Sequence, residues 1–191
     1  MAIEKELIRC PWCLSSPLMK SYHDKEWGVP VHDDKLHFEY IVLDSFQAGL
    51  SWSTILNKRE NFRKAFDGFD ALKISRYSEK KIEKLLNDEG IIRNRLKIHA
   101  TIGNAKAFLK IRKEFGTFDK YIWQFTDGKV LSNKLKTHKQ IPARTKHSDA
   151  MSEDLYSRGF KFVGPTICYA YMHAAGMVND HLVSCHRYGK V

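Results

Sequence analysis

The spacing of apolar side chains predicts a mainly helical chain. Within residues 33–48, one stripe of a helix is formed by Leu36, Tyr40, Leu43 and Gln47. Aspartates at the start of this segment suit the positive end of a helix, and Gly49 is a typical helix stop. A second helix is predicted over residues 51–66, with an inward face made of Trp52, Ile55, Phe62 and Phe66.

Further helices are predicted over residues 78–86, 93–115, 117–125 and 148–157, with Ser148 as the cap of the last one. The longest of them ends at Gly116, and its spacing places on the core face Leu96, Ala100, Gly103, Ala107 and Ile111. Residues 129–145 are the least regular part of the chain, and β-strand signals are sparse. The pattern therefore predicts an all-α fold, organised as a single domain over residues 1–191.

Residues 158–176 have the pattern of a helix end, a tight hairpin bounded by glycines, and a further helix that begins near Pro165. A hairpin that presents backbone N–H groups before a helix N-terminus can bind a phosphate. The spacing alone is equally compatible with an ordinary connection between helices.

Composition narrows the class of protein. The 191 residues include 32 Lys+Arg and 22 Asp+Glu, which gives a formal net charge of +10, and 43% are hydrophobic. This apolar content is too high for a disordered chain, and no stretch reaches the roughly 18 apolar residues that span a bilayer. The first twenty residues lack the apolar core of a signal peptide. We therefore expect a cytoplasmic protein, nucleoid-associated if bacterial, with no membrane partner.

The positive charge is concentrated in two blocks. Residues 91–113 and 129–147 are rich in Lys and Arg and contain no Asp or Glu. Such blocks provide the sequence-independent attraction to phosphates that nucleic-acid-binding proteins need. One block alone would be typical of a solvated helix face or a mobile loop, but two in one small basic protein favour a polyanion as partner.

The chain has 4 cysteines and 9 histidines, and some of them have the spacing of metal ligands. His181 and Cys185 are four residues apart and would share one face if this segment were helical. A tetrahedral metal site would be completed from Cys10, Cys13 and His23 at the other end of the chain. Cys10 and Cys13 also resemble a redox pair, but no βαβ pattern surrounds them. Cys168 lies among apolar residues and is predicted to be a core residue.

Four segments contain long and unusual motifs: YHDKEWGVP at 22–30, QAGLSW at 47–52, GFKFVG at 159–164 and VNDH at 178–181. In this order they closely resemble the 3-methyladenine DNA glycosylase I family, over nearly the whole chain. The resemblance implies a two-lobed helix-hairpin-helix fold, with a base pocket between the lobes. It also implies a monofunctional enzyme that excises 3-methyladenine from alkylated double-stranded DNA and leaves an abasic site. No obligate protein partner is implied, and we expect a monomer.

The resemblance also assigns candidate site residues. It implies one structural zinc per chain that ties the N- and C-terminal segments together, held by Cys10, His23, His181 and Cys185. The matched positions imply that the base contacts Trp52 and Tyr22, and that Trp12 and Trp27 line the pocket. Any one of these aromatic residues, taken alone, is more typical of core packing. An enzyme that flips a base must replace its stacking, and a cationic base favours aromatic faces and a carboxylate.

The family typically has a glutamate as its pocket carboxylate, where this chain has Asp44. Aspartate keeps the negative charge but is one methylene shorter, which could lengthen the contact with the base. We predict that Asp44 recognises the base; the alternative is that Asp44 and Glu39 are merely solvated helix residues.

The segment with Gln47 and Gly49 is placed to push Leu50 into the gap left by the flipped nucleotide. The alternative is that Leu50 begins the apolar face of the next helix. Lys161 and Gly164, in the predicted hairpin, would hold the DNA backbone. Two other functions remain open at this point: a zinc-containing DNA-binding protein without catalysis, and a glycosylase of the same fold that acts on another damaged base.

Overall fold

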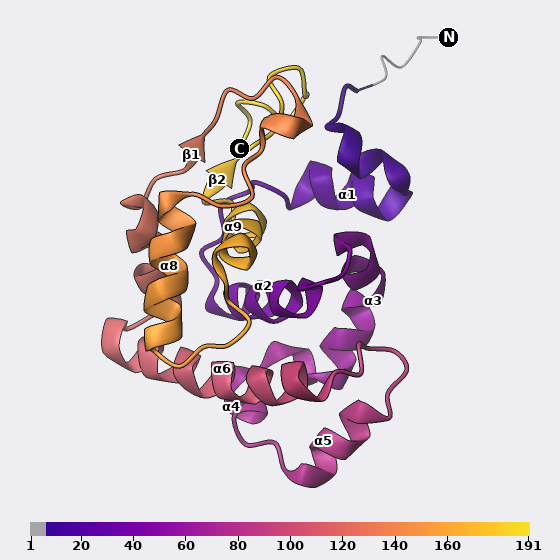
Figure 1. The fold of residues 1–191 in the computed structure, drawn as a ribbon, viewed down its shortest axis with the longest axis vertical. Helices are drawn as coiled ribbons and strands as arrows, with labels where there is room; N and C mark the ends of the chain where they lie inside the picture. The colour runs from indigo at the N-terminus through magenta and orange to yellow at the C-terminus, as the bar shows by residue number, and fades with distance from the viewer. Residues whose placement is uncertain (1–6) are drawn as a thin grey trace.

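The computed structural model describes residues 7–191, and helices form most of it (Figure 1). The longer helices are α1 (Pro17–Lys25), α2 (Asp34–Gln47), α3 (Trp52–Ala65), α5 (Glu79–Leu86), α6 (Arg95–Phe115), α8 (Lys146–Ser157) and α9 (Pro165–Ala174). Short helices are α4 (Ala71–Ile74) and α7 (Phe118–Ile122), and 3-10 turns are η1 (Pro11–Ser15), η2 (Asp67–Phe69), η3 (Trp123–Thr126) and η4 (His138–Gln140). The prediction of a helical fold class is confirmed.

A single small parallel ladder joins β1 (Leu131–Ser132) to β2 (Val178–Asn179) within the described residues. Its first strand lies in the segment that the sequence pattern marks as irregular. No helix in residues 7–191 combines the length and apolar character needed to cross a membrane.

Helix α2 occupies the middle of the molecule and packs against α3, α6 and α9 (Figure 1). Asp33 caps it by accepting a hydrogen bond of 2.7 Å from the backbone N–H of Leu36, as the sequence predicts for this end. Because neighbours cover several sides of α2, its polar residues are buried as well: Glu39 is 5% exposed and Asp44 is 2% exposed. The alternative of two solvated carboxylates is therefore wrong.

Two details of the predicted helices differ from the structure. Leu96 is 72% exposed, whereas the predicted core residues Ala100, Ala107 and Ile111 are buried, and the buried surface of α6 extends to Ile98, Ala105 and Phe108. Helix α8 begins earlier than predicted, with Thr145 as its N-cap. Ser148 is the third helical residue there, and its hydroxyl accepts a hydrogen bond of 2.9 Å from the Thr145 N–H in a capping box.

The buried apolar side chains form two clusters. The larger one surrounds α2, α6 and α9, whereas the smaller one includes Tyr22, Trp27, Leu56 and Leu182. Trp52 is half-buried and packs against both clusters. The boundary between the two clusters is where the cavity described below opens.

The segment that follows α1 is held against the end of α9. The N–H of Gly28 donates to the carbonyl of His173 at 2.9 Å, and the N–H of Val31 donates to the carbonyl of Ala175 at 3.1 Å. Gly176 permits this approach: it has φ +67°, and a Cβ on it would lie 2.1 Å from the carbonyl carbon of Val29. This packing fixes α1, and the residues it carries, relative to α9.

Candidate functional site

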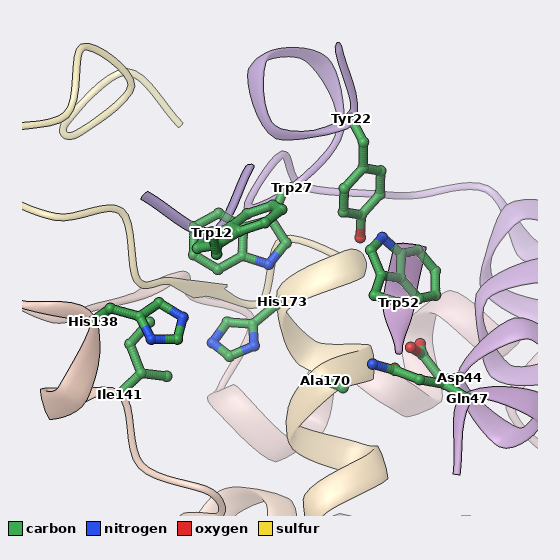
Figure 2. A pocket seen from close by; sticks show the side chains of 10 residues that line it. All are labelled: Trp12, Tyr22, Trp27, Asp44, Gln47, Trp52, His138, Ile141, Ala170 and His173. Atoms are coloured by element: carbon green, nitrogen blue, oxygen red, sulfur yellow. The ribbon is translucent and has the colours of Figure 1, made fainter. Parts of the chain in front are cut away.

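A cavity of about 210 Å³ lies between the N-terminal segment, α2 and α9. Figure 2 shows its lining, which consists of Trp12, Tyr22, Trp27, Asp44, Gln47, Trp52, His138, Ile141, Ala170 and His173. Every residue that the sequence placed in the base pocket is present, together with Gln47. We call this cavity the aromatic pocket.

The aromatic residues of the pocket form two pairs. The rings of Tyr22 and Trp52 have centroids 5.1 Å apart, and those of Trp12 and Trp27 are 5.0 Å apart. Figure 2 shows the first pair on the Asp44 side of the pocket and the second pair on the His138 side. Burial raises the pKa of the Tyr22 hydroxyl well above its ordinary value, so this group is neutral and able to donate a hydrogen bond.

Helix α2 directs the carboxylate of Asp44 and the amide of Gln47 toward the pocket beneath Trp52 (Figure 2). Burial raises the pKa of Asp44 well above its ordinary value, and the Arg59 guanidinium only partly opposes this. The Oδ2 atom of Asp44 is buried without a hydrogen-bond partner, as is Oε1 of Gln47. The same is true of the indole Nε1 atoms of Trp12 and Trp52. Unpaired buried acceptors and donors around one cavity indicate a site for a polar, aromatic ligand.

Residues 47–50 form a tight turn between α2 and α3, which we call the Leu50 turn. The N–H of Leu50 donates to the carbonyl of Gln47 at 2.6 Å, and Gly49 has φ +80°, a conformation that favours glycine. The next residue, Ser51, caps α3 by accepting a hydrogen bond of 3.1 Å from the N–H of Thr54. Leu50 therefore precedes the helix, and its side chain is 41% exposed. An exposed leucine at the tip of a turn beside the pocket is available for contact with a partner.

The predicted hairpin at residues 159–164 is present and leads directly into α9. Gly164 is the N-cap of that helix, and Pro165 occupies its first turn, as the sequence predicts. Lys161 is exposed, while its backbone is fixed by Asn104 through hydrogen bonds of 2.8 and 3.0 Å. The same helix that starts at this hairpin supplies Ala170 and His173 to the aromatic pocket.

Four side chains from opposite ends of the chain meet in one buried cluster: Cys10, His23, His181 and Cys185. Their ligand atoms all lie within 4.8 Å of one another. The Nδ1 atom of His181 is 3.8 Å from Sγ of Cys10 and 3.6 Å from Sγ of Cys185. The Nε2 atom of His23 is 3.5 Å from Sγ of Cys185. This is a group that could hold a metal ion.

We call these four residues the Cys–His cluster. In each of its histidines, the ring nitrogen that faces away from the other ligand atoms contacts a group outside the cluster. Nδ1 of His23 lies 2.8 Å from a carboxylate oxygen of Asp24, and Nε2 of His181 lies 3.0 Å from the carbonyl of Trp27. Such contacts fix the orientation of a ligating imidazole. Because Trp27 also lines the aromatic pocket, the cluster and the pocket share a wall.

The two other cysteines, Cys13 and Cys168, lie outside the cluster. The thiol of Cys13 donates to the carbonyl of Cys10 at 3.1 Å, and burial raises its pKa to about 11. Cys168 is buried in the core, as predicted from its apolar neighbours. The segment with His181 and Cys185 consists of turns and is not helical, so these ligands converge without sharing a helix face.

Sequence reasoning missed four pocket residues. His138 and Ile141 lie in η4 and directly after it, where no periodic pattern exists. Ala170 and His173 lie on the predicted helix α9, but the face that meets the pocket depends on packing. His173 is held by Asp180, whose Oδ2 atom lies 2.9 Å from Nε2 of the imidazole. The signal that sequence reasoning could have used for His173 is a histidine on the mainly apolar helix that follows the glycine-flanked segment.

The two basic blocks are not uniformly free to meet a phosphate. Arg112 pairs with Asp34 at 2.9 Å, and Arg144 pairs with Asp149 at 3.0 Å. Lys97 is buried, at 6% exposed. The remaining exposed cations include Lys106, Lys110, Lys113, Lys134, Lys136 and Lys139.

Comparisons with known proteins show which family this chain resembles. A family model described as methyladenine glycosylase matches residues 12–188. The DNA-3-methyladenine glycosylase 1 of Escherichia coli strain K12 is 49% identical over 177 residues, which cover 93% of this chain and 95% of that protein. A crystal structure of a 3-methyladenine DNA glycosylase I has a TM-score of 0.91 at 46% identity, covering 94% of this chain and 98% of the other. A structure described as the basis of 3-methyladenine recognition by the Staphylococcus aureus enzyme has a TM-score of 0.92 at 32% identity, covering 96% and 97%.

Proposed function

Because this chain belongs to the methyladenine glycosylase family, we propose that it hydrolyses the N-glycosidic bond of 3-methyladenine in alkylated DNA and leaves an abasic site. The resemblance carried by the four sequence motifs is thereby confirmed, as is the prediction of a DNA glycosylase. The observation that best supports this substrate is the aromatic pocket with a buried, unpaired carboxylate at one side.

The substrate base must leave the duplex to reach this pocket. Flipping removes its stacking on neighbouring bases, and aromatic side chains can replace that stacking. Tyr22 and Trp52 are our candidates for the stacking contacts, and Trp12 and Trp27 for the walls beside them. The spacing of their rings and their position in the lining of the aromatic pocket support this assignment.

Asp44 is our candidate for recognition of the lesion. Methylation at N3 makes the adenine of the nucleotide cationic, so a nearby carboxylate stabilises it by charge as well as by hydrogen bonding. The exocyclic amine of the base can donate to the unpartnered oxygen atoms of Asp44 and Gln47. The shorter reach of aspartate is compatible with this role because α2 places the carboxylate at the pocket lining itself.

The chemistry requires little from a general acid. Water attacks C1′ of the deoxyribose, the C1′–N9 bond breaks, and its electron pair neutralises the departing cationic base. The proton of the water is lost to solvent, and the products are an abasic site and free 3-methyladenine. The catalysis we propose therefore comes from binding the transition state more strongly than the intact substrate. No lysine is among the described residues that line the aromatic pocket, so the pocket offers no amine for a Schiff base, consistent with a monofunctional enzyme.

Contacts to the DNA itself are assigned to two segments. The exposed Leu50, presented by Gln47 and Gly49, is our candidate for the side chain that fills the gap left by the flipped nucleotide. Lys161 and Gly164 are our candidates for holding the backbone, because the hairpin exposes a lysine and ends at the N-terminus of α9.

The Cys–His cluster is proposed to hold one structural zinc. A tetrahedral zinc with Zn–S near 2.3 Å and Zn–N near 2.0 Å separates a sulfur from a nitrogen by about 3.5 Å. The sulfur–nitrogen distances of 3.5, 3.6 and 3.8 Å in this cluster fit that geometry. The metal would supply cross-linking between Cys10 and the C-terminal segment, and so would hold Trp12 and Trp27 in place. Assembly of the whole pocket from one chain supports a monomer as the active unit.

Release of bases from alkylated DNA tests this function directly. Purified protein is incubated with methylated duplex DNA, and the released bases are separated and identified. We expect 3-methyladenine as the main product. Retained DNA binding with no released base would contradict catalysis, and release of a different base would contradict the proposed substrate.

A further inference from the structure

Lys97 lies in the first turn of α6 with its ammonium group inside the protein, although it belongs to the acid-free block that we predicted to attract phosphates. Its Nζ atom donates to the carbonyl of Phe46 at 2.8 Å and to the carbonyl of Ala48 at 2.6 Å. No carboxylate in residues 7–191 forms an ion pair with it. Backbone carbonyls are therefore the hydrogen-bond acceptors that hold this cation. Burial lowers the pKa of the Lys97 ammonium group.

The two carbonyls belong to the end of α2 and the beginning of the Leu50 turn. The last carbonyls of a helix have no amide partner within the helix, and a cation at this end also interacts favourably with the helix dipole. The ammonium group therefore fixes the direction in which the chain leaves α2. The chain then passes through Gly49 at φ +80° and presents Leu50 to the surface.

The same ammonium group faces the 159–164 hairpin. Nζ of Lys97 lies 5.9 Å from the centre of the Phe162 ring, and Phe162 has a backbone φ of +56° that is unusual for a residue with a side chain. Two turns further along α6, Asn104 binds the backbone of Lys161 through both its amide oxygen and its amide nitrogen. One helix thus holds both segments to which we assign DNA contacts.

We propose that Lys97 is a positioning residue that fixes the Leu50 turn relative to the 159–164 hairpin, so that insertion of Leu50 and contact with the DNA backbone occur together. This inference rests on the function proposed above. The ammonium group links the two segments directly, because it donates to the carbonyls of Phe46 and Ala48 and faces the ring of Phe162. Lys97 acts through these segments and does not itself touch the base or a phosphate.

Lys97→Met tests the idea, since methionine retains an unbranched stem but removes the donors. The matched control is Lys106→Met on the same helix, where the lysine is exposed. Affinity is measured for an undamaged duplex and for a duplex with a tetrahydrofuran abasic analogue, and excision is measured in single turnovers on methylated DNA. We expect Lys97→Met to lower the preference for the abasic duplex, and the excision rate, by about tenfold. Binding to undamaged duplex and its salt dependence should be unchanged, because a buried cation releases no counterion.

The control should leave the ratio of the two affinities at its wild-type value, whether or not Lys106 meets a phosphate. A Lys97→Met protein that loses affinity for both duplexes equally, with a smaller salt dependence, would identify Lys97 as a phosphate contact and overturn the inference. An unchanged ratio and excision rate would overturn it as well. Binding of free 3-methyladenine, followed by tryptophan fluorescence, should stay within about threefold of wild type; a larger loss would mean that the pocket itself is disrupted, against the proposal.

A double-mutant cycle separates positioning from general stability. If Lys97 acts through the turn, Lys97→Met should have little further effect on excision in a Leu50→Ala background, so the two effects are strongly non-additive. Additive effects would overturn the coupling. Failure of the wild-type protein to release 3-methyladenine would contradict the proposed function instead, so the two ideas are tested separately.

Discussion

Replacing Asp44 with asparagine should make the free protein more stable and much less active. Asp44 is 2% exposed and its Oδ2 atom has no partner, so the folded chain must either bury a charge or bind a proton there. The folded pKa is raised, whereas the unfolded chain has the ordinary aspartate pKa of about 3.9. The folded state therefore binds more protons, and stability falls as the pH rises from about 4 toward the folded pKa.

The size of the effect follows from this linkage. At pH 7 the loss of unfolding free energy caused by the raised pKa of Asp44 has an upper limit of about 4 kcal/mol. The reason is that pH 7 lies about 3 units above the pKa in the unfolded chain, at roughly 1.4 kcal/mol per unit. An asparagine still buries an unpaired amide, which costs about 1–2 kcal/mol. We therefore expect a net gain of about 2 kcal/mol for Asp44→Asn, or a Tm higher by roughly 4–8 °C.

Thermal unfolding at a series of pH values measures this difference. At about pH 4, where the charge penalty vanishes, only the cost of the amide remains and the variant should have a slightly lower Tm than the wild type; the difference in Tm should change sign and grow toward neutral pH. Glu153→Gln is the matched control, since this exposed glutamate on α8 should change Tm little at any pH. A variant that is less stable at neutral pH, or a gain that does not depend on pH, would refute the argument from burial.

The same variant tests recognition. A hydrogen bond to a charged group contributes about 1.5–3 kcal/mol, so removing the charge of Asp44 should slow release of 3-methyladenine by about 10- to 100-fold. The assay is single-turnover excision from methylated DNA, with Glu153→Gln again as the control. Unchanged release by Asp44→Asn would remove Asp44 from the site.

Three other expectations concern separate parts of the molecule. Trp52→Ala should weaken binding of free 3-methyladenine by about 10- to 100-fold, since stacking on an aromatic side chain contributes about 1–3 kcal/mol; a fluorescence or calorimetric titration measures it, and equal affinity would contradict the stacking role. Cys185→Ser should lose zinc and lower Tm, whereas Cys13→Ser should keep one zinc per chain; metal analysis of both proteins decides, and full zinc in Cys185→Ser would exclude the proposed ligand set. Lys139→Gln should reduce the slope of log Kd against log salt by about 0.9 if this exposed lysine meets a phosphate, and an unchanged slope would place the DNA elsewhere.

The parts of the fold that depend on local chemistry could be predicted from the sequence. Asp33 caps α2 and Gly49 follows it, because both the hydrogen bond to a free N–H and the left-handed backbone are properties of a few neighbouring residues. The exposure of Leu96 could not be predicted in this way. Helical spacing correctly predicts that Ala107 and Ile111 are buried, but which residues of the first turn of α6 are covered depends on packing against α2 and α4.

The Cys–His cluster shows a different limit. Spacing identified both halves, but it could not distinguish Cys10 from Cys13, which belong to the same short turn. Their orientation decides: Cys10 points to His181, whereas the thiol of Cys13 turns back to the carbonyl of Cys10. Only the family resemblance selected the correct cysteine in advance.

A count of basic residues does not distinguish a lysine that is buried against backbone carbonyls from a lysine that faces solvent. Lys97 and Lys106 are equivalent in the sequence as members of one acid-free block, yet the first is buried against carbonyls and the second faces solvent. A block of basic residues therefore gives an upper limit for phosphate contacts, because a lysine that satisfies the end of a helix is not available to DNA.

We propose that selection of the damaged base follows from the same buried carboxylate that is expected to destabilise the free protein. An undamaged adenine is neutral, so placing it beside Asp44 leaves the buried charge uncompensated or keeps the carboxyl protonated. A nucleotide methylated at N3 is cationic, and its arrival allows Asp44 to ionise with a partner in contact. The resulting gain in binding free energy is available only to the lesion. It grows with pH until the carboxyl of Asp44 is ionised in the free protein as well. In this proposal, the cost in free energy of burying the carboxyl group of Asp44 is present before binding, and only a cationic base removes it, which gives discrimination between the lesion and undamaged adenine.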